Sequence, residues 1–277
     1  MASKKTKKRR AVLIILALII FISIFAFDAR LSVTEYTLES DKLTDSFTAV
    51  LITDLHSCKY GDGQIKLINA VKNASPDVIF LSGDIVDDKL PRTPAYEFLR
   101  EVSADYPCFY VSGNHEFWSN DISTIKADIS DLGISVLEGD SVSPEFSDNV
   151  IICGIDDPDV GEGEFSRQLE NCASSVSNDA FTILLSHRPE RISQYASYGF
   201  DTVLSGHAHG GQVRLPVILE DGLFAPNQGF FPKYTCGVHE YNNTNLIISR
   251  GLARESTRLP RIFNRPELVV VKFSPQA

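Results

Sequence analysis

Short apolar runs recur along the chain, and each one stops abruptly at glycine or polar residues. Runs of four to seven residues, the usual length of a buried strand, cover residues 47–53, 78–81, 108–111, 181–185 and 201–204. Helices are predicted between these runs, at residues 64–73, 93–101 and 121–132, and the first of them shows clear helical spacing of apolar side chains. This alternation of strands with helices predicts an α/β domain.

The rest of the pattern is less regular. Further strands are predicted at residues 134–137 and 150–155, and Pro189 is placed to begin a helix. Beyond Gln212 the chain becomes rich in Gly, Pro, Phe and Arg, with strands predicted at residues 246–249 and 268–273. We expect these last two strands to complete a second sheet.

The first 27 residues differ from the rest of the chain. Six of the 26 bases lie within residues 1–10, without any acid, and an uncharged apolar run extends from Ala11 to Phe27. At ~1.5 Å per residue this run covers roughly 25 Å, the short end of what spans a bilayer. Bases beside a span favour the cytoplasmic side. The pattern predicts a single-pass protein of the cell membrane, with a basic cytoplasmic tail (1–10), a transmembrane anchor (11–27), a linker (28–44) and an extracytoplasmic domain (45–277).

Two other uses of the apolar run stay open. One is a cleaved secretory signal, although the run is longer than the usual signal core and no small-x-small cleavage pattern follows it before Asp28. The other is a twin-arginine signal at Arg9 and Arg10, although no Ser or Thr precedes this pair.

The charge of the chain and its cysteine content limit the kinds of partner and cross-link that can be expected. Residues 11–277 carry 20 bases against 36 acids, and such a body repels nucleic acid backbones. The five cysteines are scattered without a C-x-x-C pair, so no disulfide framework is expected. We therefore expect no nucleic acid partner, and no protein partner is evident.

Polar side chains that can bind metal follow five of the predicted strands. They are Asp54, His56, Asp84, Asn114, His187, His207 and His209. In α/β proteins, sites form beyond the carboxyl ends of the strands, so we expect these side chains to meet. His207 and His209 are two residues apart, and the glycines around them allow close approach of backbone to a small charged group. Taken alone, however, this pair fits solvated or hydrogen-bonded loop histidines equally well.

The chemistry of this set favours two metal ions. Imidazole, carboxylate and amide ligands without thiolate suit Mn²⁺, Fe or Zn²⁺ rather than copper(I), and the imidazoles argue against Ca²⁺. Seven ligands are too many for one tetrahedral ion. They suit two ions roughly 3.5–4 Å apart that share a carboxylate.

The order of these motifs resembles the calcineurin-like metallophosphoesterase superfamily. It runs D-x-H at residues 54–56, G-D-x-x-D at 83–87, G-N-H-E at 113–116, a lone His187 and G-H-x-H at 206–209. The wording SGDIVD, SGNHEF, LLSHRPE and SGHAHGGQ is most similar to its bacterial membrane-associated or exported branch. The likeness covers residues 45–275 and implies a four-layer α/β/β/α sandwich of two mixed sheets flanked by helices, here behind an N-terminal transmembrane helix.

The resemblance also implies a role for each residue. One metal would be bound by Asp54, His56 and His209, the other by Asn114, His187 and His207, with Asp84 bridging them. A hydroxide between the metals would attack phosphorus while His115 stabilises charge on the phosphoryl group. Asp87 would orient His115, with Glu116 as a competing partner. Arg188 and Arg254 are candidate substrate-binding residues, with surface pairing as the alternative.

These implications predict a dinuclear metal-dependent phosphoesterase, acting on a phosphodiester or a phosphomonoester. The anchor would hold the site near the bilayer, so we expect a membrane-associated or envelope-associated substrate, such as a lipid-linked phosphate ester. One alternative is a metal-containing binding protein without turnover. Another is a soluble exported phosphatase of nucleotides or small phosphate esters. Asp62, Asp77 and Asp88 are expected to be turn or surface carboxylates.

Overall fold

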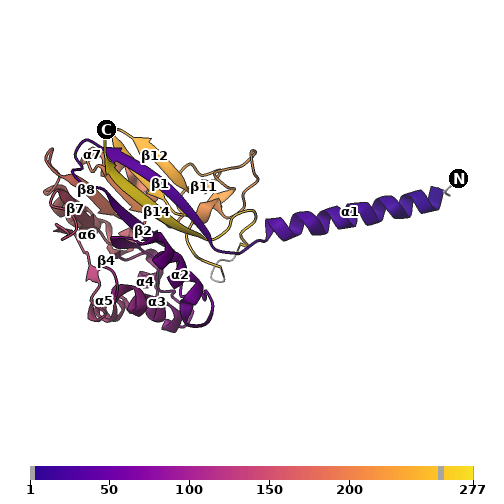
Figure 1. Cartoon of the computed structure of the whole chain (residues 1–277), viewed down its shortest axis with the longest axis horizontal. Coiled ribbons are helices and arrows are strands. Elements are labelled where there is room, and N and C mark those ends of the chain that lie inside the picture. Colours follow the sequence, from indigo (N-terminus) through magenta and orange to yellow (C-terminus); the bar gives the residue numbers. More distant parts are fainter. Residues whose placement is uncertain (1–3, 255–258, 277) are drawn as a thin grey trace.

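Two six-stranded mixed sheets form the centre of the folded domain. The computed structural model describes residues 4–254 and 259–276 (Figure 1). The first sheet has, in spatial order, β1 (Ser32–Ser40), β14 (Glu267–Pro275), β2 (Phe47–Ile52), β3 (Val78–Ser82), β4 (Cys108–Val111) and β5 (Ser135–Val136). The second has β12 (Gly237–Tyr241), β13 (Thr244–Ile248), β9 (Thr202–Ser205), β8 (Phe181–Leu185), β7 (Val150–Gly154) and β6 (Asp140–Val142).

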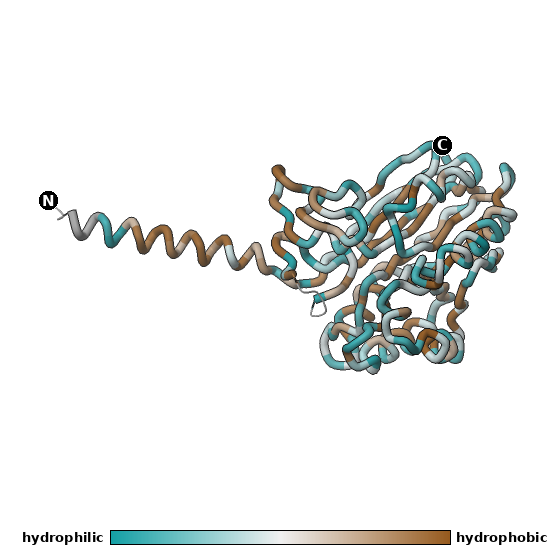
Figure 2. Tube along the Cα trace, turned by 180° about the vertical axis from the view of Figure 1, so that it is seen from behind, coloured by the Kyte–Doolittle hydropathy of each residue, from teal (hydrophilic) through white to brown (hydrophobic). Residues whose placement is uncertain are grey.

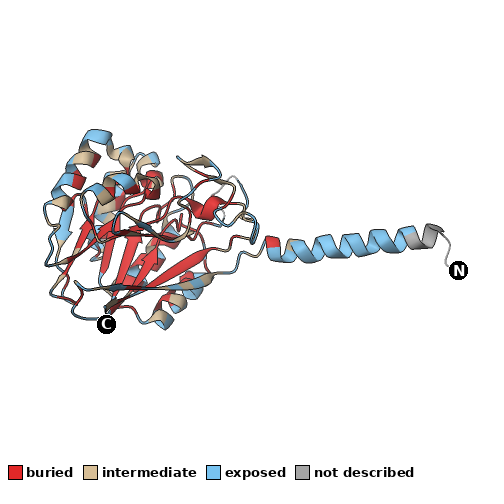
Figure 3. Cartoon of the chain, turned by 90° about the horizontal axis from the view of Figure 1, so that it is seen from above, coloured by how far each residue is buried: buried red, intermediate tan, exposed pale blue. Residues whose placement is uncertain are grey.

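Helices cover the outer face of each sheet. The first sheet packs against α2 (Ile65–Ala74), α3 (Thr93–Ser103) and α5 (Ile122–Asp131). The second sheet packs against α6 (Glu162–Ala173) and α7 (Ile192–Ser197). A third apolar cluster fills the space between the two sheets. The predicted α/β/β/α sandwich is thus confirmed, and Figure 3 shows its buried strands lying in the interior.

Strand β3 shows how the sequence produces these layers. Successive side chains of a strand point to opposite faces, so an apolar strand can contribute to two cores at once. Val78 and Phe80 belong to the cluster between the sheets, whereas Ile79 and Leu81 belong to the cluster under the helices. An uninterrupted apolar run is therefore what a strand covered on both faces requires.

The structure corrects two expectations about the ends of the domain. The predicted linker, residues 28–44, contains β1, which pairs in parallel with β14 over nine residues. Strand β14 lies in the first sheet, between β1 and β2, and does not complete the second sheet as predicted. Strand β13 does lie in the second sheet. Apolar alternation specifies which faces of a strand are buried, but it does not specify the neighbouring strand.

Several elements escaped prediction because their sequences are short or polar. They are β6, β12, α6, the five-residue helix α4 (Asn114–Trp118), and a small hairpin of β10 (Phe224–Ala225) and β11 (Gly229–Phe230). The other predicted strands and helices are present with ends shifted by a few residues, and β4 matches its predicted range.

A long apolar helix precedes the domain and projects away from it (Figures 1 and 2). This helix, α1 (Lys4–Ala26), is continuous through the basic and apolar segments that the sequence separated. Its stretch Lys8–Ala26 is long and apolar enough to cross a membrane, a property that anchors share with signal sequences. Its last residue is held by the domain, because the backbone N–H of Phe263 donates to the carbonyl of Ala26 at 2.7 Å.

The strand directions place one edge of the first sheet beside the end of α1. Strands β2, β3 and β4 are parallel, β14 is antiparallel to β2, and β1 is parallel to β14. The carboxyl ends of β2, β3 and β4 therefore lie at the edge where β1 begins, six residues after α1 ends. Any site built on those strand ends faces the same side as the apolar helix.

The core between the sheets gives a test of this packing. Phe80 is fully buried there, so Phe80→Ala should lower the free energy of unfolding by about 3–5 kcal/mol through lost burial and the cavity left behind. Urea unfolding of the detergent-solubilised chain would measure this. Phe231 is 71% exposed, and Phe231→Ala should change the same quantity by less than about 0.5 kcal/mol. Equal effects of the two variants would contradict the assigned core.

Candidate functional site

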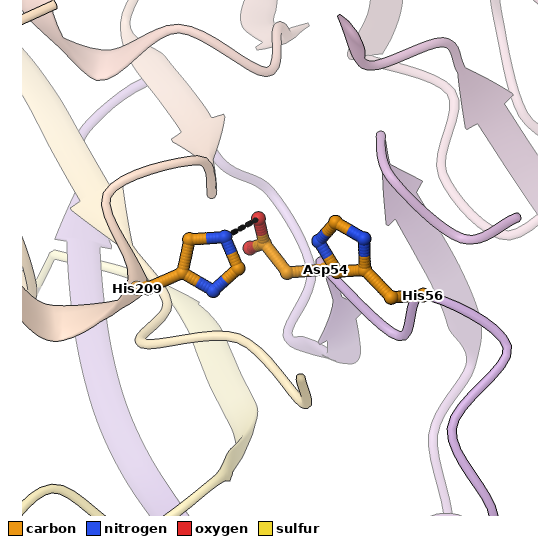
Figure 4. Close-up of side chains that lie close together, drawn as sticks. All are labelled: Asp54, His56 and His209. Carbon is orange, nitrogen blue, oxygen red and sulfur yellow. Dashed lines mark ion pairs between the residues drawn. The ribbon is translucent and has the colours of Figure 1, made fainter. Parts of the chain in front are cut away.

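The predicted metal-binding side chains meet at the carboxyl ends of the central strands. Asp54 and His56 follow β2, Asp84 follows β3, Asn114 begins α4 after β4, His187 follows β8, and His207 and His209 follow β9. All seven are buried. Ligand atoms of Asp54, His56 and His209 lie within 4.8 Å of one another, and so do those of Asp84, His187 and His207. Figure 4 shows the first group, with Nε2 of His209 3.6 Å from Oδ1 of Asp54.

Asp84 lies between the two groups. Its Oδ2 atom is 3.1 Å from Nε2 of His187 and 3.5 Å from Nε2 of His56. Its Oδ1 atom accepts a hydrogen bond from the backbone N–H of His115 at 2.8 Å. This carboxylate therefore contacts a histidine of each group, which is the position that a carboxylate shared by two ions must take.

Hydrogen bonds on the far side of two imidazoles orient them toward this centre. Nδ1 of His56 is 3.1 Å from Oδ2 of Asp87, and Nδ1 of His187 is 2.8 Å from the carbonyl of Ser82. Both acceptors hold a proton on Nδ1, so each Nε2 faces the site. Partners of this kind are typical of metal-binding histidines, whose ring orientation and tautomer they hold.

Four ligand-type atoms at the centre are buried and form no hydrogen bond within the described chain, although two of them, Asp84 Oδ2 and His187 Nε2, lie 3.1 Å apart as an ion pair. The four atoms are His56 Nε2, Asp84 Oδ2, Asn114 Oδ1 and His187 Nε2. A buried polar atom left without a partner costs about 1–3 kcal/mol. Lone pairs of nitrogen and oxygen that converge in this way are satisfied together by a cation. The set therefore fits divalent metal ions that accept mixed N and O ligands.

The backbone at the site adopts an unusual conformation. Five of the seven residues have a positive φ between 47° and 66°, namely Asp54, His56, Asp84, His207 and His209. This region is sparsely populated by residues other than glycine, and each such residue costs about 1–3 kcal/mol. Such conformations persist only where their surroundings hold them. Glu116 is one such support, because its carboxylate accepts backbone N–H bonds from Asp84, Ile85, Val86 and Gly113.

Electrostatics separate the histidines into two kinds. Burial and the positive charge of Arg188 hold the pKa of His207 well below its usual value, and burial with His56 does the same for His209. These imidazoles are neutral, the form that binds metal. Burial also lowers the pKa of His187, but the carboxylate of Asp84 outweighs it and raises that pKa to about 10. The negative charge of Asp84 thus attracts a cation into this centre.

His115 stands beside the two groups described above, and a ring nitrogen of His115 lies within 4.8 Å of ligand atoms of His56 and Asp84. It lines a pocket of about 590 Å³, and its ring lies edge-on to that of His56 at a centroid distance of 4.3 Å. Although burial lowers its pKa, the carboxylates of Asp87 and Asp84 outweigh this and raise that pKa to about 9. This position suits a side chain that contacts a substrate held against the metals.

Two neighbouring carboxylates lie beside Nδ1 of His115. Nδ1 of His115 is 2.8 Å from Oδ1 of Asp88, whereas Oδ2 of Asp87 is 3.5 Å away and lies closer to His56. Asp88, expected to be a surface carboxylate, is thus the nearest partner. Glu116 is engaged with backbone amides and does not compete for His115. The turn after β3 brings Asp84, Asp87 and Asp88 to one site, and spacing in the sequence did not reveal the contact with Asp88.

Of the two candidate substrate-binding arginines, only Arg188 lines the pocket. Arg188 is buried in the pocket wall, where it binds the carboxylate of Asp157 and donates to Oδ1 of Asn227 at 2.6 Å. Arg254 is exposed outside the pocket lining, donates to the carbonyl of Lys59 at 3.0 Å and stacks over the ring of Tyr60.

Sequence reasoning missed part of the pocket. Its wall also includes Lys89, Trp118, Asp159, Gln212, Phe224, Pro226, Asn227 and Leu259. Most of these residues lie outside the motifs, in loops that return to the site only in the folded chain. Of these pocket residues, only Gln212 belongs to a sequence motif, at the end of SGHAHGGQ.

Gly113 provides a steric test of the site. Its φ is −110°, so alanine suits the backbone, but a Cβ there would overlap the carboxylate of Asp84. Gly113→Ala should therefore reduce the metal content of the reloaded protein from about two ions per chain to one or fewer, measured by elemental analysis. A Cβ at Gly163 meets nothing within 4 Å, and Gly163→Ala should load like the parent. Full loading of both variants would contradict the site.

Similarity to known proteins agrees with this geometry. A family model described as calcineurin-like phosphoesterase matches residues 47–211. The uncharacterized metallophosphoesterase YkuE of Bacillus subtilis is 28% identical over 250 residues, which cover 86% of this chain and 83% of that protein. A transmembrane protein with metallophosphoesterase domain from Danio rerio is 25% identical over 233 residues, 78% of this chain and 51% of that protein.

The chain spans between 50% and 83% of the length of the first bacterial relatives. Among solved structures, a dimetal phosphatase from Danio rerio aligns with a TM-score of 0.47 and 13% identity, over 74% of this chain and 88% of that one. The family model extends over more than half of the chain and includes all seven metal-type residues. The chain therefore belongs to the calcineurin-like phosphoesterase family.

Proposed function

We propose that this protein is a membrane-anchored phosphoesterase that hydrolyses a phosphate ester with two divalent metal ions. The convergence of buried ligand-type atoms from His56, Asp84, Asn114 and His187, none of which forms a hydrogen bond, carries this proposal. One ion would be held by Asp54, His56 and His209, and the other by Asn114, His187 and His207. Asp84, which contacts a histidine of each group, would be shared.

Two divalent ions supply an activated water near neutral pH and positive charge for the phosphoryl oxygens. The chain itself orients the reacting groups. His115 bonds Asp88 through Nδ1, which leaves Nε2 to donate to a phosphoryl or leaving-group oxygen in the pocket. Arg188 is held by Asp157 and Asn227, so it adds positive charge to the wall without swinging toward solvent.

The substrate class follows from the size of the pocket and from the anchor. A pocket of about 590 Å³ admits a phosphodiester or a phosphomonoester with an organic group. Helix α1 would hold the domain at the membrane, and its basic N-terminal residues favour an extracytoplasmic domain. A membrane-associated or envelope-associated phosphate ester is therefore the proposed substrate.

Hydrolysis of chromogenic esters tests the catalytic proposal. The full chain in detergent, stripped of metal and reloaded with Mn²⁺, should release p-nitrophenol from bis(p-nitrophenyl) phosphate or p-nitrophenyl phosphate. Asp84→Asn should abolish release because it removes the charge shared by both groups. His115→Ala should lower kcat about 10²–10⁴-fold, the usual worth of a positioned proton donor.

The variant Asp88→Asn distinguishes the positioning of His115 from the binding of metal. It should lower kcat with little change in metal content, because Asp88 contacts His115 and is not among the proposed ligands. Asp77→Asn alters an exposed carboxylate that caps the N–H of Thr48, and it serves as the matched control with unchanged kcat. No release by the parent, despite two ions per chain, would refute the proposed activity.

Membrane extraction tests the anchor. The full chain, expressed in a bacterial host, should stay with the membranes after washes in high salt and in alkaline carbonate, since α1 offers an uninterrupted apolar surface. Detergent should release it at its full mass of 30.7 kDa. Recovery of a shorter chain in the soluble fraction would instead identify the helix as a cleaved signal.

A further inference from the structure

An unusual apolar surface lies on the segment between the His207–His209 loop and β12. We call residues 213–231 the apolar insert. Its exposed side chains include Val217 at 89%, Ile218 at 82%, and Phe230 and Phe231 at 71% each. Large apolar side chains rarely gather on a free surface without a partner.

A turn at the tip of the insert presents two of these side chains. The N–H of Ile218 donates to the carbonyl of Leu215 at 3.1 Å, so residues 215–218 form a β-turn with Pro216 and Val217 at its centre. Val217 has a φ of 70°, at a turn position where glycine or asparagine is the usual residue. A β-branched residue there is a true outlier. A polar residue such as asparagine would be less strained at this exposed position. The presence of Val217 therefore indicates that its apolar side chain contacts a partner.

The insert is tied to the end of α1. The N–H of Arg214 donates to the carbonyl of Ile262 at 2.9 Å, and the N–H of Ile262 donates to the carbonyl of Gln212 at 3.1 Å. The next residue, Phe263, donates its N–H to the carbonyl of Ala26, the last residue of α1. Figures 1 and 2 show the loops around β11 at the end of the domain that α1 joins.

The insert is also one wall of the pocket. Phe224, Pro226 and Asn227 line the pocket together with His115 and His207. The ring of Phe224 packs against that of Phe230 at a centroid distance of 5.5 Å across the β10–β11 hairpin. One short hairpin therefore joins the pocket wall to the exposed apolar surface.

The remaining exposed apolar side chains gather at the same edge. Outside residues 4–27, which are α1 and the adjoining Phe27, and outside the insert, the large ones among the described residues are Val33, Ile65, Trp118, Val238 and Leu259. Trp118 and Leu259 line the pocket. The other three stand within the first two residues of β1, α2 and β12, all of which begin at this edge. The apolar surface of the domain is thus concentrated on the side that faces along α1.

We propose that the apolar insert penetrates the bilayer beside α1 and that the pocket opens at the membrane interface, where it takes a phosphate ester carried by a membrane lipid. Interfacial residues of this kind bury in the boundary between headgroups and acyl chains. The phosphate of a lipid lies in that boundary, so an insert buried there would bring its pocket wall beside the phosphate. The lipid substrate rests on the proposed phosphoesterase function, whereas the membrane contact of the insert does not.

Quenching by brominated lipid tests the membrane contact without any need for activity. The single Trp118 is replaced by Phe, and one indole is introduced by Ile218→Trp or by Phe231→Trp. The full chain is reconstituted in vesicles of phosphatidylcholine and phosphatidylglycerol with brominated acyl chains. Asn178→Trp is the control, because Asn178 is exposed in the loop before β8, at the opposite edge.

Both indoles in the insert should be quenched at least about threefold more strongly than the control indole, because only acyl-chain depth brings them near bromine. Quenching equal to that of the control would overturn the membrane contact. A circular dichroism spectrum and melting temperature like those of the parent would show that each variant is folded.

A comparison of two diesters with the same leaving group tests the lipid substrate. One is a phosphatidyl p-nitrophenyl diester in vesicles, and the other is bis(p-nitrophenyl) phosphate in solution. In each, water adds to phosphorus, the bond to p-nitrophenolate breaks, and a proton is released. The double variant Val217→Asn, Ile218→Asn should lower kcat/KM about tenfold for the vesicle substrate, and less than about twofold for the soluble one, if the insert acts through the membrane.

The outcomes distinguish the two proposals. Equal loss on both diesters, or loss on neither, would overturn the lipid role of the insert. Hydrolysis of neither diester by the parent would refute the phosphoesterase function, while the bromine quenching would still decide the membrane contact. Asparagine suits a positive φ at residue 217, so a fall in melting temperature is not expected from that change.

Discussion

The buried carboxylate of Asp84 is the constraint on which the site depends. A charge taken out of water must be paired or must bind a cation. Asp84 is 1% exposed, and both of its oxygens face polar atoms of the site. Its surroundings make room for it and hold it. Gly113 lacks a side chain that would collide with the carboxylate, and Glu116 accepts the backbone N–H of Asp84 itself. The left-handed backbone at five ligand-type residues follows from the same need to turn every side chain inward at the strand ends.

The order of strands in the first sheet connects this centre to the apolar helix. Strand β14 runs antiparallel to β2, and β1 runs parallel to β14. The chain thus enters the sheet at the same edge where β2, β3 and β4 deliver their polar residues. Contacts from residues 262 and 263 join the end of α1 to the loop after β9. Anchor, pocket and apolar insert are therefore neighbours because of topology, although α1 and the insert are separated by almost 190 residues.

Prediction from sequence succeeded for features that a single short stretch of the chain specifies. An apolar strand that stops at a polar ligand-type residue is visible in the chain, and strand polarity alone brings such ends together. It failed where the partner is set in three dimensions. Strand β1 was predicted to be a linker because it is an edge strand that buries only one face, so its sequence alternates with polar residues and lacks a continuous apolar run. The bond between His115 and Asp88 was missed because the turn after β3, held by Glu116, decides which carboxylate reaches the ring.

By itself, the pattern of the sequence determined the alternation of strands and helices, the apolar helix before the domain and the set of residues that can bind metal, whereas the four layers were implied by the family resemblance. Side-chain periodicity and ligand chemistry are local properties of the chain, so they can be read without coordinates. Only the tertiary structure decided that β14 joins the first sheet, that Asp88 is the carboxylate nearest to His115, and that the apolar insert lies beside α1. These facts depend on which distant segments pair, and pairing is settled by the packing of the whole chain rather than by any one stretch of it.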